Sequence, residues 1–290
     1  MKKYELTEET KTEFGVTLHR IRALRSFGDV EEGELGGWIE KEKNLSQEDN
    51  SWVSGNALVY GDAWVYGNAL VYGDALVYGN AWVYGNAEVY GDARVSGNAR
   101  VYGNARVYGN ALVYGDALVS GNALVYGDAR VSGNAEVYGD ALVYGDARVY
   151  GNALVYGDAW VSGNAEVSGN ARVYGNARVY GNALVYGDAL VSGNAWVSGN
   201  AWVSGNAWVY GDADISSNSD IFLVTKIGSR NDTTTFFKSK ENEIWVNCGC
   251  FSGNIDQFAT KVTETHGDNE HGQAYRLAIQ IAKLRIKVSE

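Results

Sequence analysis

The residues best suited to chemistry lie near the C-terminal end of the 290-residue sequence. Cys248 and Cys250 alternate with Val246 on one expected strand, and two of the three histidines, His266 and His271, follow them. A thiolate beside a histidine can act as a nucleophile, and the two cysteines and two histidines could ligate a metal ion. Their spacing matches no standard zinc pattern, and a free cysteine is usually a small buried hydrophobe. We therefore expect no catalytic residue, no metal ion and no cofactor, and keep the thiol and the metal site as alternatives.

Two polar turns in the same region are the best candidates for recognising a partner. One turn is 229–232 and the other is 266–269. As plain surface turns they need no function, but surface loops also carry many binding residues. The candidate recognition residues are Arg230, Asn231, Asp232, His266, Asp268 and Asn269.

Residues 214–290 read as a small α+β module that carries these side chains. Strands are expected at 221–226, 233–238 and 244–251, with turns between them. Helical spacing begins at Ile255 and should end at Gly267, and a second helix is expected from about Gln273. The expected apolar stripe of that second helix is Leu277, Ala278, Ile281 and Leu284. A module of this size could cover one end of the preceding segment and still present a binding surface.

The segment 52–213 is an uninterrupted repeat of six residues. Its 27 units read x-Val-(Tyr/Ser)-Gly-(Asn/Asp)-Ala, with Trp, Leu, Arg or Glu at the first position. Successive side chains of a strand point to opposite faces, so Val and Ala share one face and the variable residue shares the other with Tyr or Ser. The constant Val/Ala face should be the inside, because a narrow core needs constant small volumes. Gly with Asn or Asp then turns the corner.

These units predict a mainly β fold, a left-handed parallel β-helix of triangular cross-section. Three units close one coil, so the repeat gives about nine coils. Residues 1–51 should hold a strand at 17–24 and then a capping coil, because Ile39 and Leu45 are six apart and stand where valines would stand. The expected organisation is therefore 1–51, 52–213 and 214–290.

The spacing of Val and Ala resembles the hexapeptide repeat of the left-handed β-helix superfamily. That superfamily includes acyltransferases, which use a histidine on or near the coils, and zinc-dependent carbonic anhydrases, which use three. The histidines here are His19, His266 and His271, none of them in the repeat, and no loop interrupts the 27 units. The Tyr-rich repeat sequence, and the segments 36–40 and 44–46 that precede it, also resemble uncharacterised proteins encoded in phages and prophages.

The variable face of the repeat is rich in large apolar side chains. Leu or Trp occupies 17 of the 27 variable positions, and stacking at i+18 places Trp196, Trp202 and Trp208 on the three faces of the last coil. Such aromatic columns can simply support the sheets. They can also form a contact surface, so we expect binding of a protein partner or self-association as a homodimer or homotrimer.

Composition narrows the class of partner and the compartment. A formal net charge of −11 argues against general binding to nucleic acid or anionic lipid, and no segment has the apolar length of a membrane span. The polar N-terminus and the two cysteines favour the cytoplasm of a bacterial host. We expect a non-enzymatic solenoid scaffold of phage or prophage origin that binds a partner through the C-terminal module and the outer aromatic faces. The alternatives are an enzyme with a Cys/His site in the module and a carbohydrate-binding or virion component. A counter-defence inhibitor is one form of the first hypothesis.

Overall fold

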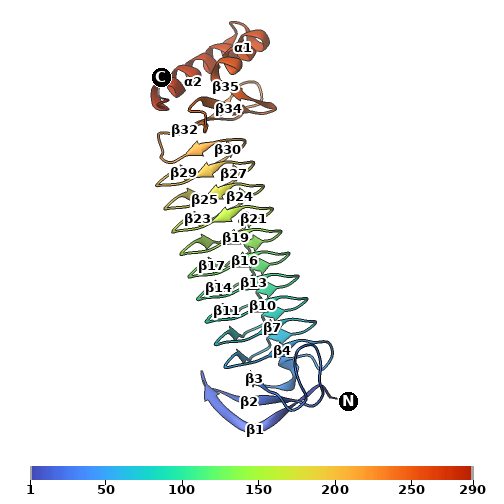
Figure 1. Ribbon diagram of the computed structural model, residues 1–290. Coiled ribbons are helices and arrows are strands. Elements are labelled where there is room, and N and C mark those ends of the chain that lie inside the picture. The colour runs from blue at the N-terminus through green and yellow to red at the C-terminus, as the bar shows by residue number, and fades with distance from the viewer. Residues whose placement is uncertain (1, 289–290) are drawn as a thin grey trace. The chain divides into compact units, whose positions relative to one another are not determined.

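The computed structural model describes residues 2–288 and has the mainly β, parallel-solenoid fold of about ten turns that the repeat predicts. It divides into two compact units, Met1–Gly157 and Asp158–Glu290. Strands β4 (Trp52–Val53) to β31 (Asp214–Ile215) are two residues long, and each begins six residues after the last (Figure 1). Strands β4 to β21 (Leu154–Val155) belong to the first unit, and β22 (Trp160–Val161) to β31 belong to the second. The left-handed sense of the coil stays a prediction.

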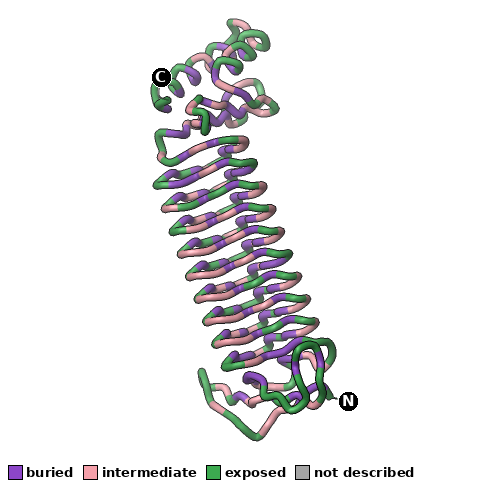
Figure 2. The backbone as a smooth tube through the Cα atoms, in the orientation of Figure 1, coloured by how far each residue is buried: buried purple, intermediate pink, exposed green. Residues whose placement is uncertain are grey.

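The inside and outside of the solenoid are as the alternation predicts. Repeat valines and alanines are at most 1% exposed from Val53 to Ala213 (Figure 2). Residues eighteen apart pair in parallel, for example Arg106 with Leu124 and Val107 with Val125. Backbone N–H groups donate to the next coil, as Tyr108 N does to the carbonyl oxygen of Val125 at 3.0 Å. Each coil therefore satisfies the edge of its neighbour.

Glycine is required at the corners for two reasons. Gly103 has a φ of +71°, where a Cβ is strained, and a Cβ there would lie 3.0 Å from the backbone nitrogen of Gly121 in the next coil. The following Asn or Asp extends the contact between coils. Asn86 donates to Asn104 at 3.0 Å, Asn104 donates to Asn122 at 3.0 Å, and Asn122 donates to Asp140 at 2.9 Å. Asparagine can both donate and accept, whereas an ionised aspartate only accepts and so ends such a series.

The N-terminal segment closes the first coil. Strand β1 (Tyr4–Glu13) pairs antiparallel with β2 (Val16–Ala23), and β2 pairs antiparallel with β3 (Leu35–Ile39). Strand β3 then pairs in parallel with β5 (Leu58–Val59), and the 3-10 turn η1 (Glu42–Asn44) leads to Leu45. Ile39 lies beside Val59 and Leu45 beside Val65, so both occupy valine places as predicted. Strand β1 was not predicted from the sequence.

The C-terminal module is a four-stranded antiparallel sheet with two helices. Its elements are β32 (Ile221–Ile227), β33 (Asp232–Lys238), β34 (Ile244–Cys248), β35 (Phe251–Asn254), α1 (Ile255–His266) and α2 (Glu270–Arg285). Two local expectations were wrong. The strand expected at 244–251 is two strands, because Gly249 (φ +58°) turns the chain between them. Helix α2 begins at Glu270, because the Asn269 side chain caps it by accepting from Gly272 N at 2.9 Å.

The sheet of the module covers the last coil of the second unit with one face. Trp208 N donates to Thr235 Oγ1 at 3.1 Å, and Asn247 Nδ2 donates to the Trp208 carbonyl at 2.9 Å. Trp202 N donates to Asn218 Oδ1 at 2.7 Å. These backbone groups belong to a coil with no following repeat, so the side chains complete an edge that would otherwise stay open.

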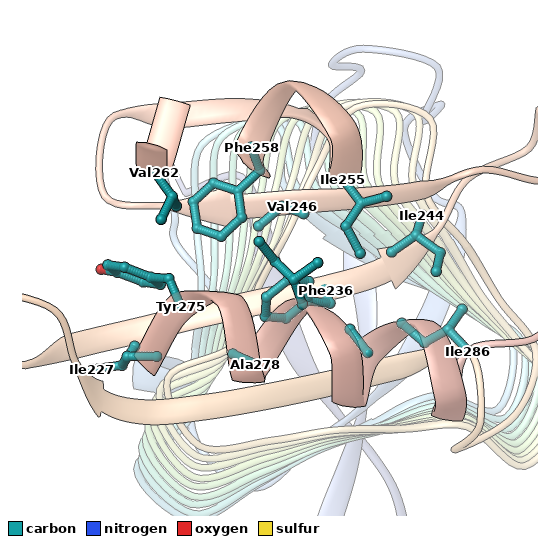
Figure 3. Close-up of a cluster of buried hydrophobic side chains, with 12 residues drawn as sticks. Ile227, Phe236, Ile244, Val246, Ile255, Phe258, Val262, Tyr275, Ala278 and Ile286 are labelled. Carbon is teal, nitrogen blue, oxygen red and sulfur yellow. The ribbon is translucent and has the colours of Figure 1, made fainter. Parts of the chain in front are cut away.

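The other face of the sheet packs against both helices. Phe236 and Val246 from the sheet meet Phe258 of α1 and Ala278 of α2 in one core, and all four are at most 3% exposed (Figure 3). No helix in the described range 2–288 is long and apolar enough to cross a membrane.

Candidate functional site

A pocket of about 420 Å³ opens at one end of the helix–sheet core of the module. Its wall comes from the β32–β33 turn, the β34–β35 turn, α1 and α2. The structure thus brings together five residues that the sequence singled out from separate segments, and these are Arg230, Asp232, Cys248, Cys250 and His266. The apolar part of the wall consists of Phe251, Phe258, Val262 and Tyr275. The side chains of Phe258, Val262 and Tyr275 converge from the two helices (Figure 3).

Cys248 is held in a small hydrogen-bond network at the wall. Thr234 Oγ1 donates to Cys248 Sγ at 3.1 Å, and Cys248 Sγ lies 3.4 Å from Tyr275 Oη. Burial and the hydrogen bond to Cys248 raise the pKa of the Tyr275 hydroxyl above its usual value. The tyrosine hydroxyl is therefore protonated near pH 7 and can donate a hydrogen bond to the sulfur. Both contacts hold Cys248 in place between β33 and α2.

Two glycines allow side chains of the pocket wall to pack directly against backbone. Gly228 has a φ of +71°, and a Cβ there would overlap the Tyr275 hydroxyl. Gly249 has a φ of +58°, and a Cβ there would lie 3.3 Å from Arg230 Nη1. The Tyr275 ring and the Arg230 guanidinium therefore lie directly over backbone that carries no side chain.

The charged groups of the pocket are not equivalent. Arg230 forms no hydrogen bond or ion pair with any residue that the structure describes. Lys261 Nζ is ion-paired with Glu264 at 3.3 Å, and Asp232 Oδ1 accepts from the next backbone N–H, of Thr233, at 2.7 Å. The exposed guanidinium of Arg230 is thus the available cation at this opening.

The two histidines of the module are neighbours. The ring centroids of His266 and His271 are 5.8 Å apart, and that of His266 is 5.6 Å from Tyr275. Cys248 is half-buried and Cys250 is exposed. Within residues 2–288, no three His, Cys, Asp or Glu side chains form a group that could hold a metal ion.

The remaining residues of the two predicted turns have local structural contacts. Asn231 takes a φ of +53° in the turn. Asp268 Oδ1 accepts from Arg276 Nη2 at 3.1 Å, and Asn269 caps α2. These contacts account for Asp268 and Asn269 without a ligand.

The three tryptophans of the last coil lie on three different sheets, as predicted, and are not brought together. Trp196 is in β28 (Trp196–Val197), Trp202 in β29 (Trp202–Val203) and Trp208 in β30 (Trp208–Val209). Lys240 Nζ lies 4.2 Å from the Trp196 ring centroid, and the guanidinium carbon of Arg178 lies 5.7 Å from it. Trp202 is 51% exposed and Trp208 is 43% exposed, so these two rings are open to solvent.

The tyrosines of the first unit form close columns. In the column Tyr72, Tyr90, Tyr108, Tyr126 and Tyr144, successive ring centroids are 4.8–5.0 Å apart and the rings are within 5° of parallel. Each inner ring therefore covers the face of the next, and only ring edges meet solvent. A sugar stacks on a ring face, so this column is a poor carbohydrate site and a good support for the sheet.

Helix α2 has a second, exposed apolar face, which carries three of the four residues of its expected apolar stripe, whereas the fourth, Ala278, is buried. Leu277 is 60% exposed, Ile281 is 44% exposed and Leu284 is 71% exposed. The packed residues are instead Tyr275, Ala278, Ile279, Ala282 and Ile286. Both sets have helical spacing, so periodicity alone could not decide which one faces inward. We call Leu277, Ile281 and Leu284 the outer face of α2.

Comparison with known proteins supports the solenoid. A family model described as the YdcK Beta solenoid repeat matches overlapping segments, which are 53–67, 63–79, 69–85, 87–103, 93–109, 99–115, 105–121, 117–133, 147–163, 165–181, 171–187, 177–193, 185–199 and 195–211. The repeat is similar to that of YdcK. The protein named "Uncharacterized acetyltransferase YdcK" from Escherichia coli (strain K12) is 40% identical over 70 residues, which are 21% of this chain and 22% of that protein. The match thus spans about a fifth of the relative's length.

Proposed function

We propose that this protein is a non-enzymatic solenoid scaffold whose C-terminal module binds a protein partner through the outer face of α2. The observation that carries the proposal is the exposure of Leu277, Ile281 and Leu284, three and four residues apart on one helix face. Large apolar side chains grouped in this way are typical of helix-recognition surfaces. Arg285 borders this face and has no ion-pair partner in the described range, so an apolar partner surface with an acidic flank fits best.

Phage or prophage origin and a counter-defence role belong to the same proposal. They rest on the resemblance of the repeat and its lead-in to uncharacterised phage proteins. In this reading, the solenoid fixes a spacing and the module sequesters a factor of the bacterial host cytoplasm. Self-association through the same face is the alternative form of binding.

The test is capture of a partner by the full chain from bacterial lysate, with two matched variants. Leu277→Ser combined with Leu284→Ser removes the apolar contact of the outer face. Trp202→Ser removes an apolar side chain of the solenoid that is 51% exposed. We expect the first variant to lose a reproducibly captured protein and the second to keep it. Capture that survives in the α2 variant and fails in Trp202→Ser would refute the assignment and move the contact to the solenoid.

Light scattering of the purified chain separates self-association from partner binding. A dimer or trimer that becomes monomeric in the α2 variant would make a second copy the occupant of this face. A monomer in both variants, together with loss of capture, supports a different protein as the partner.

Acyl transfer is the second candidate, because the matched relative is named as an acetyltransferase. In this chain the reactive candidates are Cys248, with its contact to Tyr275, and His266 in the same pocket. Incubation with an acetyl-thioester donor and a panel of amine and hydroxyl acceptors tests it directly. Under the first proposal Cys248→Ser and wild-type protein give the same background rate. Turnover that disappears in Cys248→Ser or His266→Ala would establish the enzyme instead.

A further inference from the structure

The pocket of the module has the features of a small-ligand site that the proposed function does not use. Its volume of about 420 Å³ falls in the range of roughly 300–1,000 Å³ that is usual for ligand pockets. Its inner wall is aromatic and aliphatic, with Phe251, Phe258, Val262 and Tyr275. Burial of an apolar group against this wall would be favourable. Polar atoms beside it come from Cys248, Tyr275 and His266.

The charge at the opening is unusual for this chain. The net charge of the protein is −11, yet the turn that borders the pocket presents the unpaired guanidinium of Arg230. The guanidinium packs against the backbone of Gly249, where a Cβ would lie 3.3 Å from Arg230 Nη1. A guanidinium offers two parallel N–H groups that match the two oxygens of a carboxylate.

Other charges set limits on the ligand. The Asp232 carboxylate also lines the pocket and contributes to the raised pKa of Tyr275, so a second anion deep in the pocket would be repelled. Lys261 already pairs with Glu264. A ligand therefore needs one anionic group at the Arg230 side and an uncharged apolar body.

We propose that this pocket binds a carboxylate joined to an apolar group of about the size of a benzyl side chain. The apolar group lies against Phe251, Phe258 and Tyr275, and the carboxylate pairs with Arg230. The same chemistry occurs in a free aryl-alkyl acid and in the C-terminus of a peptide that ends in an aromatic residue. Neither source requires the outer face of α2, so this inference stands independently of the proposed protein contact.

Calorimetric titration of the full chain with four probes tests the proposal. The probes are 3-phenylpropionate, its neutral primary amide, a pentapeptide ending in Phe with a free carboxylate, and the same peptide amidated. We expect each carboxylate to bind about tenfold more tightly than its amide, because a charge-assisted pair is lost. Binding by the peptide acid alone would identify a chain terminus as the source, and comparable binding by both acids would include small molecules.

Four variants locate the binding. Arg230→Gln should abolish the difference between acid and amide, and Arg230→Lys should restore it only in part, because an ammonium lacks the fork. Arg172→Gln, a matched loss of an exposed arginine on the solenoid, should change nothing. Cys250→Trp, which fills the opening from an exposed position, should weaken all four probes.

Acid and amide that bind equally, or affinities unaffected by Arg230→Gln, would overturn the proposal, as would the absence of binding by every probe. Partner capture that persists in Arg230→Gln while the probes fail would leave the proposed function intact. Probes that bind while the α2 variant still captures its partner would refute the α2 contact and leave this site standing.

Discussion

Replacing a repeat valine by aspartate should be far more damaging than the same change one residue earlier. Val125 is fully buried between Val107 and Val143 of the adjoining coils, whereas Leu124 is half-buried beside Arg106. Val125→Asp loses about 2 kcal/mol of apolar burial. It also adds about 4 kcal/mol to protonate the carboxyl at pH 7 and about 1–3 kcal/mol for its unpaired polar atoms. Leu124→Asp should cost about 1 kcal/mol, because the lost contact is partial and the carboxylate faces an arginine.

Urea unfolding followed by circular dichroism, with amide hydrogen exchange across residues 107–143, measures the difference. The pH dependence gives an internal check. A carboxyl whose folded-state pKa is raised destabilises most at high pH, and the cost falls as the pH falls towards its unfolded pKa. At pH 5.5, still above the sequence pI of about 4.8, about half of the 4 kcal/mol should remain. Equal stability of the two variants, or a Val125→Asp defect that does not change with pH, would refute the assignment of the inner face.

Three further outcomes follow from the contacts. Gly228→Ala should destabilise the module by about 2–4 kcal/mol in thermal unfolding, because the added Cβ overlaps Tyr275. The same variant should bind the pocket probes more weakly. Gly267 has a similar positive φ with no atom near its Cβ position, so Gly267→Ala should cost only about 1 kcal/mol. Lys3 is buried against Ser51, and burial lowers its pKa to about 8, so the unfolded chain holds the proton more tightly and stability should rise by on the order of 2 kcal/mol between pH 8 and 10. Lys3→Met should lack this rise in stability, and a wild-type Tm that does not change between pH 8 and 10 would contradict the prediction. Above about pH 10 the raised pKa values of buried tyrosines such as Tyr4 lower the stability instead. Deletion of residues 106–123 removes one whole coil, so the remaining coils should rejoin in phase and the module should still capture its partner. Deletion of 106–111 instead rotates the later repeats by one face. Loss of the folded β signal in the first deletion would contradict the additive stability of the solenoid.

The solenoid was predictable because every repeat carries the same residue types at the same positions. Constant Val and Ala on alternate positions leave one possible inner face, and Gly marks each corner. The irregular capping coil was predictable for the same reason, since Ile39 and Leu45 keep the spacing. Strand β1 was missed because Tyr4–Glu13 is mostly charged and threonine-rich, so only its pairing with β2 reveals a strand.

The module was less predictable because its decisive contacts are tertiary. Both apolar faces of α2 have helical spacing, and the sheet selects the one with smaller residues, such as Ala278 and Ala282. The pocket combines the 229–232 turn with Cys248, His266 and Tyr275, which no spacing in the sequence relates. The sequence did single out Arg230, Asp232 and His266 as polar turn residues, but not the aromatic wall that makes them a site.

Most side chains on the outside of the repeats already contact one another, whereas several in the module do not, which favours the module as the binding region. In the repeats, tyrosine faces are covered by neighbouring tyrosines, corner amides bond along the column, and Glu88 is held by Tyr72 and Arg106. A partner would have to replace contacts that the coils already make with one another. In the module, the outer face of α2 and the Arg230 guanidinium have no such contacts within the described residues. Binding there displaces water but breaks no hydrogen bond, ion pair or ring stack between described residues, so less free energy is lost than on the aromatic columns.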